Sequence, residues 1–155
     1  MADQITKAMI EEQIPIALRG IFIISVDAMT SEMVSVVRSF GTALNIMLAV
    51  TRLDRRIAIF FSGKLPFRKQ LANGELIFMP DLQKEGGVIN AMIENLIFFN
   101  CQVISKLPFE LQVATILEEL VHCVMLVQDE TVTSKIVTFL WPKVDFVNGQ
   151  YSIRH

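Results

Sequence analysis

Residues 109–127 of the chain read Phe-Glu-Leu-Gln-Val-Ala-Thr-Ile-Leu-Glu-Glu-Leu-Val-His-Cys-Val-Met-Leu-Val, and this stretch predicts the central helix of the fold. Pro108 precedes it, where the first turn of a helix tolerates proline. At 3.6 residues per turn, the side chains that share a face with Leu120 are apolar, namely Val113, Ile116, Leu117, Val124 and Val127. The opposite face mixes polar and apolar side chains, namely Leu111, Thr115, Glu118, His122, Met125 and Leu126. A helix that is apolar nearly all round is expected to be largely covered.

The polar residues of this helix lie in the run Glu118-Glu119-Leu120-Val121-His122. Covered carboxylates are costly unless they are paired or bound to a cation. Glu118 and His122 are four residues apart, so both project from one face, about 6 Å apart at Cβ, and can reach one metal ion. Glu119 projects to the side, where a carboxylate can act on metal-bound water. This is the geometry of the zinc motif His-Glu-x-x-His, which has two ligands one turn apart and a general base.

The run resembles the motif helix of the zincin superfamily, in particular the short bacterial gluzincin-like domains, with Glu118 in place of the first histidine. It is similar also to uncharacterised bacterial domains that carry a Glu-Glu pair, an apolar dipeptide and a nearby acidic pair. The motif-level resemblance covers residues 110–142, and upstream of these it extends only to the order of elements. The resemblance implies that Glu119 is the general base and that His122 is a metal ligand.

The third ligand implied by the resemblance is an acidic residue from the following helix, here Asp129 or Glu130. Helical phase continued from the motif helix places Asp129 with His122, whereas a turn between the two helices favours Glu130. Two carboxylates and one imidazole suit magnesium, manganese or iron at least as well as zinc. Such a set leaves less positive charge on the bound water and activates it less. The expected cofactor is therefore a divalent metal, with zinc, manganese and iron as candidates.

Three functions follow from these residues. The first is a zincin-like binding or regulatory module without conventional zinc peptidase activity. The second is a metal-dependent hydrolase, and the third is an unrelated interaction or assembly protein, in which the Glu and His side chains form only a local ion pair on a solvated helix face. A separation of about 4–5 Å between the His122 ring and the carboxylates indicates a metal-type site.

Outward from the motif helix, the patterns predict one domain over residues 1–155 with an α+β fold, in which a small, mostly antiparallel sheet is backed by helices on one side, as in a zincin. Helices are expected over 4–13, 31–51, 109–127 and 129–140. Strands are expected over 19–26, 56–62 and 75–79, with a turn at Asn73-Gly74, and residues 144–153 are strand or loop. Residues 88–101 begin as a helix and are ambiguous after Phe98, and residues 101–104 are a possible strand.

Composition limits the partners. Hydrophobic residues make up 52% of the 155 residues and charged residues 19%, which excludes disorder and favours a homo-oligomer or a protein partner. The net charge of −2, with Arg52, Arg55 and Arg56 as the densest basic cluster, makes nucleic acid an unexpected partner. A signal-peptide pattern and a long uncharged apolar segment are both missing, so we expect no membrane contact and a cytoplasmic location. Cys101 and Cys123 are expected to be buried free thiols.

Overall fold

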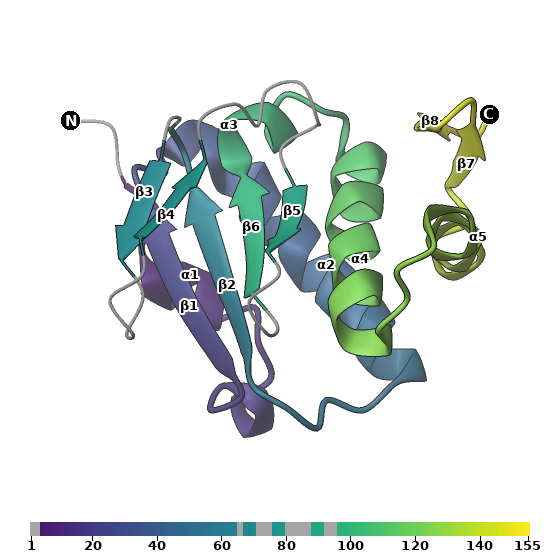
Figure 1. The fold of residues 1–155 in the computed structure, drawn as a ribbon. Helices are drawn as coiled ribbons and strands as arrows, with labels where there is room; N and C mark the ends of the chain where they lie inside the picture. Colours follow the sequence, from purple (N-terminus) through teal and green to yellow (C-terminus); the bar gives the residue numbers. More distant parts are fainter. Residues whose placement is uncertain (1–3, 65–66, 71–75, 80–87, 92–95) are drawn as a thin grey trace.

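A computed structural model describes residues 4–64, 67–70, 76–79, 88–91 and 96–155 (Figure 1). The chain contains both helices and strands, as the predicted α+β class requires. The helices are α1 (Lys7–Glu11), α2 (Val34–Val50), α3 (Cys101–Ile104), α4 (Phe109–Met125) and α5 (Glu130–Leu140), with short 3-10 turns at Ile16–Leu18 and Ser31–Met33. The strands are β1 (Phe22–Asp27), β2 (Ile57–Ser62), β3 (Phe67–Gln70), β4 (Leu76–Met79), β5 (Val88–Ala91), β6 (Leu96–Asn100), β7 (Val144–Val147) and β8 (Gln150–Ile153).

The main sheet has four strands in the order β1-β2-β6-β5. β1 pairs with β2 in parallel, β2 pairs with β6 in parallel, and only the edge pair β5/β6 is antiparallel. The prediction of a mostly antiparallel sheet is therefore wrong for this sheet. The reason is α2, which carries the chain back after β1 so that β2 starts at the same end, as a parallel pair requires. The pairs β3-β4 and β7-β8 form separate antiparallel ribbons.

The segment around β6 also differs from the sequence prediction. The expected helix from Val88 is strand β5, and the expected strand at Cys101–Ile104 is helix α3. All five residues of β6 are buried, and a continuous apolar run of this length is typical of a strand in a parallel sheet, which is covered on both faces. The Asn100 side chain accepts a hydrogen bond from the Val103 backbone N–H at 3.3 Å, which starts α3 directly after the strand.

One further difference lies between residues 64 and 80. Strand β3 was not predicted, because Phe67–Gln70 is short and carries two basic residues. The predicted turn at Asn73-Gly74 lies outside the described residues. Strand β4 lies within the range that the sequence predicted for it.

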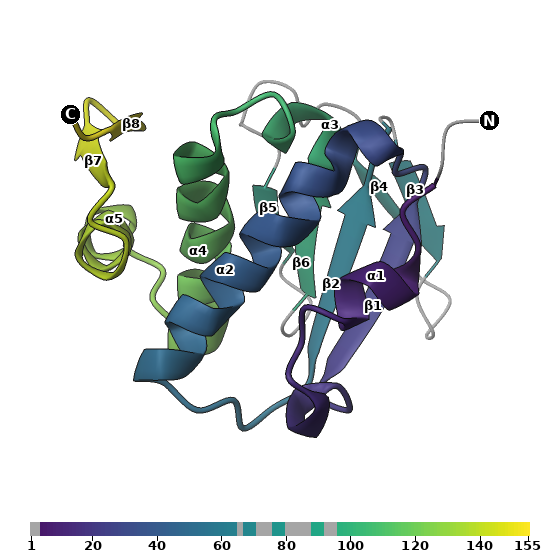
Figure 2. The ribbon, with the colours of Figure 1, turned by 180° about the vertical axis from the view of Figure 1, so that it is seen from behind.

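Helices α1, α2 and α4 lie on one face of the main sheet, as Figure 2 shows from behind. Between sheet and helices, the ring of Phe40 on α2 packs against Phe61 at a centroid distance of 5.3 Å, and Phe61 packs against Phe99 at 5.2 Å. α5 and the β7-β8 ribbon lie on the side of α4 that faces away from the sheet (Figure 1). α4 therefore contacts α2, β5 and β6 on one side and α5, β7 and β8 on the other. The expectation that this helix is covered nearly all round is confirmed.

Residues Ser31–Val50 form a segment that is long and apolar enough to cross a membrane, by length and composition alone, with a mean hydropathy of 1.6 over its most apolar window. Half of that window is buried inside the protein. Core helices of soluble proteins and signal sequences meet the same criterion, so the segment is weak support for a membrane span.

Candidate metal site

The site begins with the middle of α4. Val113, Ile116, Leu117, Leu120 and Val124 face the core and are buried. On the helix's other side, His122 is 7% exposed and Glu119 is 8% exposed, while Glu118 is partly buried. α4 ends after Met125, and Leu126 adopts the left-handed conformation with φ 56° and ψ 33°. Because this residue breaks the helical phase, the chain turns back and α5 packs against α4.

The turn decides which acidic residue approaches His122. The Asp129 carboxylate caps the N-terminus of α5, where it accepts a hydrogen bond from the Val132 backbone N–H at 2.8 Å. Glu130 lies in the first turn of α5, and its Oε2 is 3.5 Å from Nε2 of His122. Of the two residues that the sequence left open, the structure therefore places Glu130 beside His122 and uses Asp129 as a helix cap.

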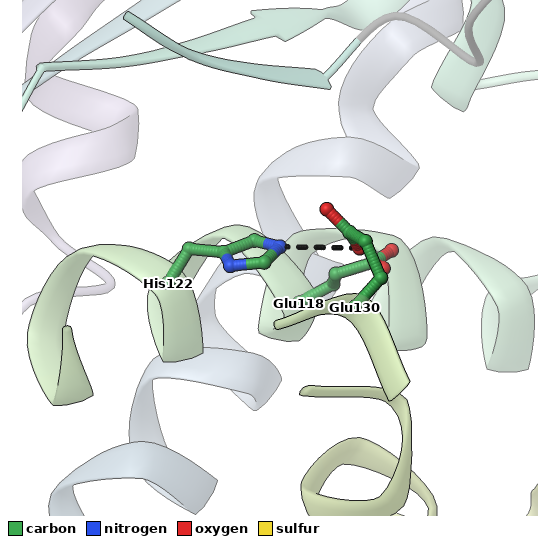
Figure 3. Close-up of side chains that lie close together, drawn as sticks. All are labelled: Glu118, His122 and Glu130. Carbon is green, nitrogen blue, oxygen red and sulfur yellow. Dashed lines mark ion pairs between the residues drawn. The ribbon is translucent and has the colours of Figure 1, made fainter. Parts of the chain in front are cut away.

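Three potential ligand atoms come together at this point. One oxygen of Glu118, one ring nitrogen of His122 and one oxygen of Glu130 all lie within 4.8 Å of one another. Figure 3 shows the imidazole of His122 pointing at the two carboxylates, with Glu118 and His122 projecting from α4 and Glu130 from the start of α5. This separation falls within the range that distinguishes a metal-type site from side chains dispersed on a helix surface. We refer to these three residues as the candidate metal site.

The His122 ring is held in one orientation. Its Nδ1 lies 2.5 Å from the carbonyl oxygen of Val127, which accepts hydrogen bonds only, so the proton is assigned to Nδ1. The Thr133 hydroxyl lies 3.4 Å from the same nitrogen and donates to the Asp129 carbonyl at 2.9 Å. In the neutral ring, Nε2 therefore presents its lone pair to Glu118 and Glu130. Histidines that bind metals are oriented in the same way, by donating the other ring N–H to a carbonyl or carboxylate.

Without a bound metal, the electrostatics of the site disfavour the ionised form of its carboxylates. Burial, followed by the charge of Glu130, raises the pKa of Glu118 to about 7, while His122 and Tyr151 act in the opposite direction. Burial is also the main cause that raises the pKa of Glu119 to about 7, where His122 lowers it and Glu118 and Glu130 raise it. Within the described residues, no Lys or Arg side chain forms an ion pair with these carboxylates. A bound cation would supply the missing positive charge.

Two buried polar atoms beside the site have no hydrogen bond of standard geometry, namely Oε2 of Glu119 and the hydroxyl of Tyr151. Buried polar side-chain atoms nearly always have hydrogen-bond partners, so two such atoms without a standard hydrogen bond at one place need an explanation. Sequence reasoning singled out Glu119 and missed Tyr151. The sequence gives no signal for Tyr151, because it lies 29 positions after His122, on a strand whose docking onto α4 is a tertiary contact.

Arg55 and the two cysteines have contacts that are typical of structural residues. The Arg55 guanidinium donates a hydrogen bond to the Val124 carbonyl at 3.0 Å, near the C-terminal end of α4. Cys101 and Cys123 are both buried thiols that form no disulfide, as predicted. Burial raises the pKa of the Cys123 thiol to about 11, which disfavours a thiolate nucleophile there.

Comparisons with family models, with curated proteins and with solved structures found no match to this chain.

Proposed function

We propose that this protein is a metal-binding module that holds one divalent cation, of the zinc, manganese or iron class, through Glu118, His122 and Glu130. The observation that carries the proposal is the convergence of the three ligand atoms within 4.8 Å, together with a histidine whose other nitrogen is hydrogen-bonded to a carbonyl. Because α4 supplies two ligands and α5 the third, the ion would bind the two helices to each other.

The donor set suits such a cation. Carboxylate oxygens and a neutral imidazole are accepted by zinc, manganese and ferrous iron. Three protein ligands leave at least one coordination position for water or another molecule. The Glu130 side chain is 73% exposed, so this position is accessible from solvent on the α5 side. These properties fit a site that takes up its ion after folding and keeps a position for a further ligand.

We further propose that the module is zincin-like in its motif helix and lacks conventional zinc peptidase activity. Support for the kinship comes from the motif run on α4, a third acidic residue on the next helix, and the strand–helix–strand order of β1, α2 and β2 upstream. The reason for inactivity is Glu118, because a carboxylate in place of a neutral imidazole leaves less positive charge on bound water and weakens its activation.

The metal proposal is tested on protein purified without chelator, by elemental analysis and by titration with Zn²⁺, Mn²⁺ and Fe²⁺. We expect one ion per chain, and we expect Glu130→Gln to lose it. Asp129→Asn is the matched control, because it removes the same charge at the neighbouring position and keeps a residue that caps helices well. Absence of uptake by the wild type, or equal uptake by Glu130→Gln, would contradict the proposal.

A second candidate function, a metal-dependent hydrolase, is favoured by Glu119. Its Oε2 is buried without a partner, and its pKa of about 7 is suited to a general base that works near neutral pH. In this function Glu119 would act as the general base toward water, and the ion held by Glu118, His122 and Glu130 would supply Lewis-acid activation. Turnover of a peptide or ester that disappears in Glu119→Gln, with metal content unchanged, would establish the hydrolase and overturn the inactive module.

The predictions of a homo-oligomer or protein partner, of no contact with nucleic acid or membrane, and of a cytoplasmic location stay predictions.

A further inference from the structure

The β7-β8 ribbon places Tyr151 against α4. Its turn consists of Asn148 and Gly149, both with positive φ, 52° and 77°, as a tight two-residue hairpin requires. Tyr151 is paired in register with Phe146, and the two rings pack at a centroid distance of 4.9 Å. Along β8 the residues alternate between exposed and partly buried, with Tyr151 and Ile153 on the covered side. The strand therefore presents Tyr151 to the protein interior.

The Tyr151 hydroxyl ends beside the metal site. It is buried and has no hydrogen bond of standard geometry. It nevertheless lies within reach of the Glu118 carboxylate, as a side-chain hydrogen-bonding contact, and β8 itself contacts α4. A phenol O–H is a hydrogen-bond donor at neutral pH.

We propose that Tyr151 is a positioning residue of the metal site, whose hydroxyl donates a hydrogen bond to the Glu118 oxygen that does not bind the ion. The inference rests on the proposed metal function and extends it, because it makes the C-terminal ribbon part of the site. A carboxylate that binds through one oxygen keeps lone pairs on the other, and a donor there fixes the orientation of the ligand. The same contact gives the buried hydroxyl the partner it lacks.

The proposal assigns three separate elements to one ion. α4 gives Glu118 and His122, α5 gives Glu130, and β8 gives the group that orients Glu118. Binding of the ion would then favour the docked position of both α5 and the ribbon. A merely structural tyrosine would contribute ring packing instead, which Tyr151→Phe keeps.

The test compares metal affinity in the wild type, Tyr151→Phe and Asp145→Asn, by competition with a chelator of known affinity. Asp145→Asn is the control, because it weakens the exposed ion pair between Asp145 and Arg154 across the same ribbon without touching the hydroxyl. We expect Tyr151→Phe to bind Zn²⁺ or Mn²⁺ about 10- to 100-fold more weakly, and Asp145→Asn to stay within about twofold of the wild type.

A spectroscopic readout accompanies the affinities. Tyr151 is the only tyrosine of the chain, so ¹³C labelling of the tyrosine ζ carbon gives a single NMR signal. This signal should shift on metal addition as the hydroxyl gains its hydrogen bond, in the wild type and in Asp145→Asn. A wild type that binds no metal overturns the proposed function itself. A wild type that binds metal, with Tyr151→Phe within threefold of its affinity, overturns the role of Tyr151 alone.

Discussion

Helix α4 carries two buried polar clusters, and they differ in how their hydrogen bonds are satisfied. In the first, the Gln112 side chain accepts from the Ser39 hydroxyl at 2.8 Å and donates to the Ser35 hydroxyl at 3.1 Å and to the Leu107 carbonyl at 2.9 Å. In the second, two turns further on, Oε2 of Glu119 and the Tyr151 hydroxyl have no hydrogen bond of standard geometry, and Glu118 and Glu130 face one histidine. Of these two clusters, only the second contains buried polar atoms without a standard hydrogen bond.

Under the metal proposal, the difference separates a structural polar group from a ligand-binding one. The Gln112 cluster joins α4 to α2 and is complete, so it fixes how the two helices pack and needs no ligand. The carboxylates and the histidine join α4 to α5, and burial raises the pKa of Glu118 and of Glu119 to about 7. The proposed ion would complete this second cluster. Variants that affect one cluster and spare the other test this distinction.

The largest expected effect is on metal affinity in His122→Ala. Loss of the only nitrogen ligand should weaken binding by about 1000-fold or more, which corresponds to about 4 kcal/mol. Chelator competition measures the change. His155, the only other histidine, lies at the C-terminus, so His155→Ala is the control and should bind normally. A His122→Ala variant that retains affinity within tenfold would show that the ion does not bind at this site.

The second prediction breaks the Gln112 cluster. Gln112→Leu should lower the free energy of unfolding by about 3 kcal/mol, because buried hydroxyl and carbonyl groups lose their partner. Urea unfolding of the metal-free protein measures it. Gln150→Leu, at an exposed position of β8, should change stability by about 0.5 kcal/mol or less. Metal affinity should remain that of the wild type in Gln112→Leu. A large loss of metal affinity would show that the two clusters depend on each other.

The third prediction concerns Glu119 and pH. Its pKa is about 7 in the folded protein against 4.5 as the ordinary value, so ionisation of Glu119 does not destabilise the metal-free protein below pH 4.5 and destabilises it increasingly as pH rises to about 7. Glu119→Gln removes this destabilisation, and it should be more stable than the wild type at pH 8, by on the order of 2 kcal/mol, with a much smaller difference at pH 4.

Unfolding of the metal-free protein at the two pH values measures this gain. Glu110→Gln, in the first turn of the same helix, should not show it. A Glu119→Gln variant that is less stable than the wild type at pH 8 would mean that the carboxylate has a favourable partner in the metal-free state.

The smallest effect is expected from Asp129→Ala. Loss of the hydrogen bond to the Val132 N–H should cost about 1 kcal/mol of stability. Because the Asp129 carboxylate caps α5, metal affinity should fall less than fivefold, far less than in Glu130→Gln. If Asp129→Ala and Glu130→Gln lose affinity equally, Asp129 is a ligand and α5 rearranges on binding.

Part of the fold was predictable from local patterns. The 3.6-residue period gave α2, α4 and α5 within a few residues, and short apolar runs bounded by turn residues gave β1, β2 and β4. The pairing of β2 with β6 was not predictable, because the segment of β6 was interpreted as the end of a helix that becomes ambiguous after Phe98, and its partner is distant in the sequence. With β6 missing, the parallel character of the main sheet could not be recognised.

The sequence by itself determined that Glu118 and His122 share one face of α4, because residues four apart in a helix always do. It also placed Glu119 to the side, and the resemblance to zincins implied an acidic residue after the helix as the third ligand. Only the tertiary structure brought Glu130 rather than Asp129 beside His122, since the left-handed residue Leu126 ends the helical phase and Asp129 is used as a cap. Only the tertiary structure brought Tyr151 to Glu118, because the docking of a ribbon onto a helix has no local signature.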